Sequence, residues 1–144
     1  MKLSVISVGK IKGPQAELCA EYAKRLTGGL TIRELATQTQ KAENAAILAA
    51  IPAKAIVVVL DERGKDLSSR ELAAKMSAWQ DQGAPELVFI IGGADGVTDE
   101  VRTRAAFTLG LGRKTWPHML ARVMLIEQLY RAQQINNGHP YHRD

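Results

Sequence analysis

The sequence predicts an α/β domain in which a mainly parallel sheet carries helices on both faces. Strand-like and helix-like segments alternate along the chain, which is typical of parallel strands joined by helices. Residues 55–60 ("AIVVVL") and 86–91 ("ELVFII") are almost wholly apolar, as strands buried on both faces are. The chain has 144 residues and no repeat, linker or low-complexity segment, so we expect a single domain over residues 1–144.

The first part of the chain alternates short strands with helices. Residues 2–9 ("KLSVISVG") alternate apolar positions and are rich in β-branched residues, which predicts a strand. A glycine–proline pair then opens a helix that runs to about residue 26. Residues 30–36 ("LTIRELA") predict a second short strand, and residues 41–51 ("KAENAAILAAI") predict a helix that Pro52 ends.

The middle of the chain predicts a helix between two buried strands. Residues 55–60 form the first of these strands and residues 86–91 the second. The helix between them covers residues 68–83. Ser68 and Glu71 have the spacing of a capping box, and the segment ends on a glycine, a residue that commonly stops a helix.

The last third of the chain begins with the loop "GGADG" at residues 92–96. Residues 98–100 ("TDE") then start a helix and place two acids at its positive end. Residues 107–112 ("FTLGLG") predict a short fifth strand. Residues 117–136 predict a long final helix that is apolar over much of its circumference, so we expect much of it to be buried.

The composition fits a cytoplasmic protein and permits an anionic partner without requiring one. The formal net charge is +4 and the pI about 9.4. Residues 110–144 carry five Lys or Arg against two acids, together with all three histidines. Cys19 is the only cysteine, which excludes an intrachain disulfide and suits a reducing compartment. The opening is too short and too quickly broken for a signal peptide, and no apolar run approaches the ~20 residues of a membrane span.

Three glycine-containing segments follow predicted strands, at residues 57–64 ("VVVLDERG"), 89–96 ("FIIGGADG") and 109–118 ("LGLGRKTWPH"). Ligands of open α/β sheets bind outside the carboxyl ends of the strands, where glycine lets a ligand approach the backbone. Each segment taken alone is most simply a turn. Together the three favour a small-molecule pocket, without naming the molecule.

Two familiar nucleotide motifs do not fit these segments. A dinucleotide fingerprint needs G-x-G-x-x-G, whereas residues 92–96 have the spacing G-G-x-x-G. A phosphate-binding P-loop needs G-x-x-x-x-G-K-[ST], whereas "GLGRKT" has an arginine between its glycine and lysine. These mismatches count against an oxidoreductase that uses a nucleotide cofactor.

The final helix and the "HPYHRD" tail combine charged, aromatic and histidine side chains. Glu127 and Arg131 lie four residues apart on one helix face, either as an ordinary surface pair or as an arginine held ready for a phosphate or a base edge. In the tail, His139 and Tyr141 suit contact with an unstacked RNA base.

The histidines do not predict a metal site. His139 and His142 are three residues apart, but a zinc site needs three or four ligands, and Cys19 is remote in sequence. We therefore expect no metal. His118 stands near the start of the final helix and is taken as structural.

Two stretches of the chain resemble a known family. The stretches "FIIGGADG" and "TWPHMLARVMLIEQLYRAQQINNGHPYHRD" are similar to the large-subunit ribosomal RNA methyltransferase H family of the knotted SPOUT methyltransferases. The resemblance runs in order from "MKLSVISVGK" to Asp144, at the expected total length, and its C-terminal motif is long and specific.

The resemblance implies a homodimer with a deep trefoil knot near the C-terminus. It further implies S-adenosylmethionine-dependent methylation of N3 of a pseudouridine in helix 69 of 23S rRNA, on the assembled ribosome. Carried over by position, the cofactor residues are Leu60, Gly93, Gly112, Arg113, Lys114, Thr115, Trp116 and Pro117. "GRKTW" replaces a stretch richer in serine and leucine, so side-chain and backbone contacts of Arg113 and Lys114 remain alternatives.

The catalytic residues implied by the resemblance are Glu127, Arg131, His142 and Arg143. In this family the tail enters the pocket of the other subunit, so "HPYHRD" would form half of a composite site. We expect His142 to accept the N3 proton, since histidine titrates near ~6.5. The two arginines would stabilise charge on the flanking oxygens, and Glu127 would orient Arg131.

Two other functions remain open from the residues alone. One is a ribosome- or RNA-binding protein that keeps the fold without the reaction. The other is a methyltransferase that acts on a different RNA site, because nothing in the residues themselves distinguishes pseudouridine from uridine.

Overall fold

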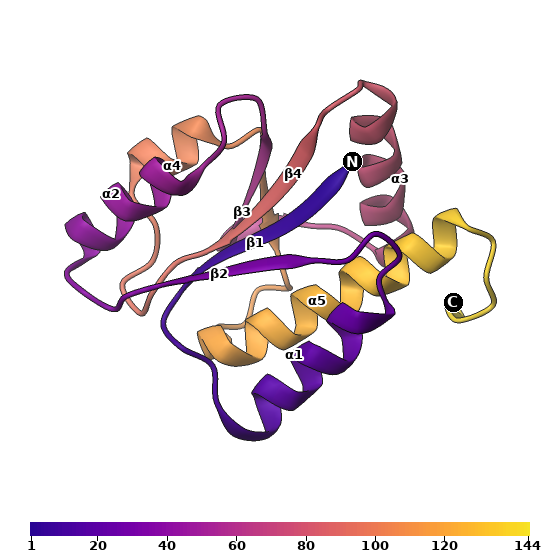
Figure 1. Ribbon diagram of the computed structural model, residues 1–144, viewed down its shortest axis with the longest axis horizontal. Coiled ribbons are helices and arrows are strands. Elements are labelled where there is room, and N and C mark those ends of the chain that lie inside the picture. Colours follow the sequence, from indigo (N-terminus) through magenta and orange to yellow (C-terminus); the bar gives the residue numbers. More distant parts are fainter.

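The computed structural model describes residues 1–144 and shows one parallel five-stranded sheet with helices on both sides (Figure 1). The strand order is β2-β1-β4-β3-β5, and every pairing is parallel. The strands are β1 (Lys2–Val8), β2 (Thr31–Leu35), β3 (Ile56–Asp66), β4 (Glu86–Ile91) and β5 (Phe107–Gly110). The helices are α1 (Gly13–Arg25), α2 (Gln40–Ala50), α3 (Ser69–Asp81), α4 (Asp99–Arg104) and α5 (His118–Asn136). The predicted α/β class and the predicted order of elements are confirmed.

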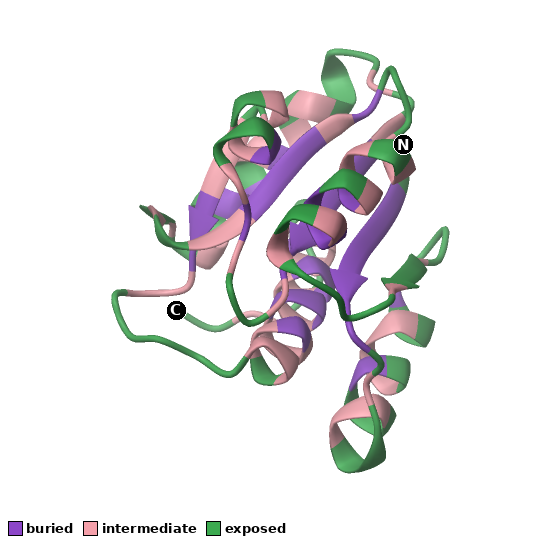
Figure 2. Cartoon of the chain, turned by 90° about the vertical axis from the view of Figure 1, so that its left-hand side faces the viewer, coloured by how far each residue is buried: buried purple, intermediate pink, exposed green.

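Two apolar clusters cover the two faces of the sheet. In β4, Leu87, Phe89 and Ile91 belong to the cluster that contains Leu125 and Leu129 of α5. The intervening Val88 and Ile90 belong to the cluster on the face of α2 and α4. Figure 2 shows these central strands as buried and the outer faces of the helices as exposed. Burial on both faces explains why the segment reads as a continuous apolar run.

The third strand is longer than its apolar core predicts. It continues to Asp66, so residues 61–64, which we expected to form a loop, belong to the strand. The register against β5 shifts between Leu60 and Lys65, a bulge that keeps the pairing after an irregular stretch. A Cβ on Gly64 would lie 2.5 Å from the carbonyl carbon of Leu109, so this crossing requires glycine. The fifth strand ends at Gly110, two residues earlier than expected.

A buried arginine ties α5 to the opposite end of the chain. Arg122 is 1% exposed and pairs with Glu34 at the end of β2. Its Nη2 also donates to the carbonyl oxygen of Gly9, just after β1, at 3.0 Å. The final helix is thereby fixed beside the carboxyl ends of β1 and β2. No helix in the structure is long and apolar enough to cross a membrane.

Candidate functional site

A cavity of about 420 Å³ opens at the carboxyl edge of the sheet. Its volume is in the range of small-molecule sites. Three stretches build most of it: the bulged part of β3, the loop after β4 and the loop between β5 and α5. The lining residues are Leu60–Arg63, Ile91–Val97, Arg102, Leu109, Leu111, Gly112, Lys114–Trp116, His118 and Ala121. The three glycine-containing segments of the sequence therefore converge on one cavity.

The loop after β4 approaches its neighbours too closely for side chains. A Cβ on Gly93 would lie 2.5 Å from Oε1 of Glu43. Glu43 itself is buried, and its Oε2 accepts a hydrogen bond from the Gln38 N–H at 2.9 Å. Gly96 has φ +78°, a conformation that favours glycine. This part of the wall therefore consists of backbone.

The structure places six of the eight expected cofactor residues around this cavity: Leu60, Gly93, Gly112, Lys114, Thr115 and Trp116. The other two, Arg113 and Pro117, belong to the same loop but are not among the residues that line the cavity. The loop is held by its own side chains. The Thr115 hydroxyl donates to Glu62 at 2.8 Å, and the Trp116 indole donates to the Leu111 carbonyl at 3.0 Å.

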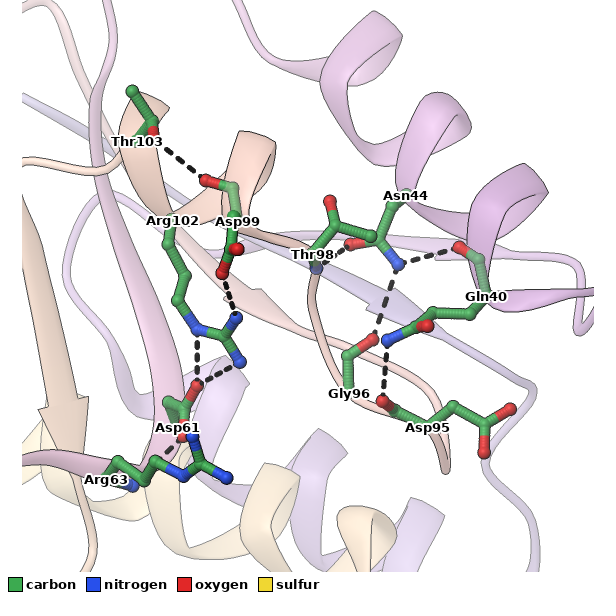
Figure 3. Close-up of polar contacts among 10 residues, drawn as sticks. All are labelled: Gln40, Asn44, Asp61, Arg63, Asp95, Gly96, Thr98, Asp99, Arg102 and Thr103. Carbon is green, nitrogen blue, oxygen red and sulfur yellow. Dashed lines mark hydrogen bonds and ion pairs between the residues drawn. The ribbon is translucent and has the colours of Figure 1, made fainter.

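Sequence reasoning missed an ion pair in the cavity wall. Arg102 of α4 donates to Asp61 of β3 at 2.8 Å and to Asp99 at 3.1 Å (Figure 3). Burial alone would raise the pKa of Asp61, but the Arg63 N–H and the Arg102 guanidinium lower it overall, so the carboxylate is charged. The available signal was an acid directly after a buried strand. His118, taken as structural, also lines the cavity.

A second cluster forms where the tail folds back on α5. Nε and Nη2 of Arg131 donate to Oε1 of Glu127 at 3.0 and 2.7 Å, and the Tyr141 hydroxyl donates to the same oxygen at 2.9 Å. The Arg131 guanidinium lies 4.8 Å from the centre of the Tyr141 ring. We call Glu127, Arg131, Tyr141 and His142 the tail cluster.

The tautomer of His142 follows from its two partners. Nη1 of Arg131 can only donate, so Nδ1 of His142, 3.1 Å away, accepts that bond. Nε2 then carries the proton and donates to Asp144 at 2.9 Å. Hydrogen bonds to Arg70 and then to His142 lower the pKa of Asp144 to about 2. Both nitrogens of His142 are therefore engaged in this conformation.

The remaining tail residues are more exposed. His139 accepts the Tyr141 N–H through Nδ1 at 3.2 Å, and Arg143 lies on the surface. No group of three or more His, Cys, Asp or Glu side chains is placed to hold a metal ion.

The tail cluster and the first cavity are separate in this chain, because none of the cluster's residues lines that cavity. A second cavity of about 550 Å³ lies between them, lined by Glu127 and Gln128 among others. Leu109 and Leu111 line both cavities, so the two hollows adjoin across the end of β5. The tail is held by contacts within its own chain, including Arg70 of α3.

Comparisons with known proteins agree with this architecture. A family model described as "Predicted SPOUT methyltransferase" matches residues 1–142. Among solved structures, a probable methylase family protein from Haemophilus influenzae Rd KW20 has a TM-score of 0.60 at 12% identity, over 99% of this chain and 70% of that one. The SpoU methyltransferase AviRb from Streptomyces viridochromogenes has a TM-score of 0.51 at 12% identity, over 96% and 61%. At these identities the likeness concerns the fold alone.

Relatives in sequence are much closer. A protein of Rhodospirillum centenum named ribosomal RNA large subunit methyltransferase H is 47% identical over 151 residues, covering 99% of both chains. Its namesake from Rhodopseudomonas palustris strain BisA53 is 45% identical over 159 residues, again covering 99% of both. The chain therefore belongs to the SPOUT methyltransferases and, within them, to the ribosomal RNA large subunit methyltransferase H family.

Proposed function

We propose that this protein transfers a methyl group from S-adenosylmethionine to N3 of a pseudouridine in helix 69 of 23S rRNA. It acts on the assembled 70S ribosome, in the cytoplasm, as a homodimer with a trefoil knot near the C-terminus. The observation that carries the proposal is the match over 99% of the chain to relatives named as methyltransferases of large-subunit ribosomal RNA.

The first cavity suits S-adenosylmethionine. Its wall near Gly93 and Gly96 is backbone, so an adenosine can approach it closely. Leu60 and Leu109 supply apolar surface, and the Gly112–Trp116 stretch closes one side. Bound there, the cofactor would supply a methyl group already activated on a positively charged sulfur. The protein's remaining tasks are to position the acceptor and to remove its proton.

The tail cluster, together with His139 and Arg143 of the tail, carries the groups for those tasks. The N3 nitrogen loses a proton, and negative charge gathers on the two flanking carbonyl oxygens. Arg131, oriented by Glu127, and Arg143 would donate to those oxygens or to the adjacent phosphate. Tyr141 and His139 offer contacts to the RNA, with the Tyr141 ring as a stacking surface.

The proposed role of His142 depends on Arg131. Its Nδ1 accepts a hydrogen bond from Arg131, so it is available as a proton acceptor only once Arg131 has turned toward the substrate. Its Nε2–H is held by Asp144. Substrate binding would thus give Arg131 a new acceptor and free Nδ1 of His142 in the same step.

The separation of the two regions supports the proposed homodimer. The tail cluster lies outside the first cavity of its own chain, so the groups that activate the acceptor and those that hold the donor are apart within one chain. A partner subunit that brings its tail to this cavity would complete the site.

The test is methylation of 70S ribosomes from a strain that lacks this gene. The purified protein with S-adenosylmethionine should add one methyl group to the helix 69 fragment, read by mass spectrometry of nuclease-digested 23S rRNA. A methyl group at another position would contradict the proposed target. Ribosome binding without methylation would instead favour a non-catalytic RNA-binding protein of the same fold.

A further inference from the structure

The first turn of α2 is hydrogen-bonded to the glycine loop of the first cavity. The Gln40 side chain donates to the carbonyl oxygen of Asp95 at 2.8 Å. Asn44 lies one turn further along the same face, and its Nδ2 is 3.3 Å from the carbonyl oxygen of Gly96. Its Oδ1 accepts the Thr98 N–H at 2.9 Å (Figure 3). Two side chains of α2 thus contact three residues of a loop some fifty residues away in sequence.

Asn44 is buried where it contacts this loop. It is 2% exposed, and a buried carboxamide is costly unless its polar atoms are paired. Both polar atoms of this carboxamide are paired, because Oδ1 and Nδ2 contact the loop and Nδ2 also donates to the Gln40 carbonyl oxygen at 2.8 Å. A helix interior does not favour asparagine, so the loop contacts are what the residue contributes here.

The opposite flank of the loop is held independently. Arg102, in the helix that follows the loop, pairs with Asp61 of β3 (Figure 3). The loop therefore lies between α2 on one side and β3 on the other. Neither Gln40 nor Asn44 lines the first cavity, whereas Gly93, Asp95 and Gly96 do.

We propose that Gln40 and Asn44 are positioning residues for cofactor binding, which hold the 93–98 loop in its binding conformation without touching the cofactor. A loop with three glycines between residues 92 and 96 has much backbone freedom to lose when a ligand binds. Hydrogen bonds made before binding remove that cost in advance and so raise affinity. This inference rests on the proposed binding of S-adenosylmethionine in the first cavity.

The test is isothermal titration of the full-length protein with S-adenosylmethionine. Asn44→Ala should weaken the affinity about tenfold, since it removes two hydrogen bonds that a buried side chain makes to the loop. Gln40→Ala, which removes one exposed bond, should weaken it about threefold. Ser4→Ala is the matched control, because it removes a partly buried 2.5 Å hydrogen bond to Glu86 at the opposite end of the sheet. It should lower thermal stability and leave cofactor affinity unchanged.

Steady-state kinetics separate positioning from a merely structural role. Both α2 variants should raise KM for S-adenosylmethionine while KM for the ribosome and kcat at saturating cofactor stay near the wild-type values. Affinities within twofold of wild type for both variants would overturn the inference. If Asn44→Ala does not yield folded protein, unchanged affinity in Gln40→Ala overturns it alone. A wild-type protein that binds no S-adenosylmethionine would refute the proposed function itself, and this inference with it.

Discussion

The first cavity and the tail cluster differ in how far main-chain and side-chain groups form them. Part of the cavity wall is backbone, where glycines stand at positions 93, 96 and 112, and the buried residues Glu43 and Asn44 lie behind the loop after β4. The tail cluster consists of side chains on one helix and the segment after it, linked by hydrogen bonds among Glu127, Arg131, Tyr141 and His142.

The difference assigns the two halves of the proposed reaction to the two regions. A backbone wall recognises a ligand through its shape and its main-chain polar groups. A side-chain cluster supplies charge and proton transfer, and it fails when a single group is changed. Substitutions in the cavity should therefore alter cofactor affinity, and substitutions in the cluster should alter turnover.

Deleting residues 141–144 should have the largest effect. Methyl transfer should fall at least about a thousandfold, because the deletion removes Tyr141, His142 and Arg143 together. The Kd for S-adenosylmethionine should stay within about twofold of wild type, since none of these residues lines the first cavity. Ribosome methylation and calorimetry measure the two effects. Normal methylation by the truncated protein would refute a role for the tail.

Gly93→Ala should produce the opposite pattern. The added methyl group would displace the Glu43 carboxylate and the loop, and we expect a loss of cofactor affinity of about tenfold or more. Gly83→Ala is the control, since Gly83 does not line the cavity and a Cβ there would face open space, whereas its positive φ makes the substitution strained. It should cost stability alone. Equal affinity losses in the two variants would mean that the effect is global.

Glu127→Gln should reduce turnover about ten- to a hundredfold, because the arginine loses the charge that orients it. The free energy of unfolding should change by less than about 1 kcal/mol, as is usual for a partly exposed helix pair. Denaturant titration and single-turnover methylation give the two numbers. Parallel losses of both would favour a structural role for this pair.

The smallest expected effect is on the alkaline titration of Tyr141. Burial, and then the hydrogen bond to Glu127, raise the pKa of Tyr141 from 10.0 to about 12. A raised pKa in the folded state adds stability that is fully present below about pH 10 and is lost as the pH rises through 12. Phenolate absorbance should therefore show one late-titrating tyrosine that disappears in Tyr141→Phe. In Glu127→Gln it should titrate earlier, though still above the ordinary value.

Much of the fold could be predicted because its signals are local. The apolar core of β4 and the capping box of Ser68 and Glu71 were correctly located from neighbouring residues alone, and the capping box is formed in the structure. The extension of β3 was missed, because "DERGKD" has no strand pattern of its own. It is held in the sheet by pairing with β5 after a register shift, which is a long-range contact.

The candidate site likewise has features that local sequence signals predict and features that they do not. Its glycine loops were visible in sequence because glycine after a strand is a local signal. The bonds that hold these loops were not, since Asn44 and Thr98, or Asp61 and Arg102, are 54 and 41 residues apart. The sequence around an asparagine or an arginine does not indicate which distant residue it will contact. The role of the tail rests on the family resemblance, because periodicity alone predicts only the Glu127–Arg131 pair.

The place of α5 has a consequence for synthesis of the protein. Leu125 and Leu129 are fully buried against the same face of the sheet as Val5 and Phe89, and Arg122 reaches back to the loop after β1. While α5 is still in the ribosomal exit tunnel, the part of that face that Leu125 and Leu129 cover exposes apolar surface. The N-terminal strand therefore completes its packing only after α5 has been synthesised.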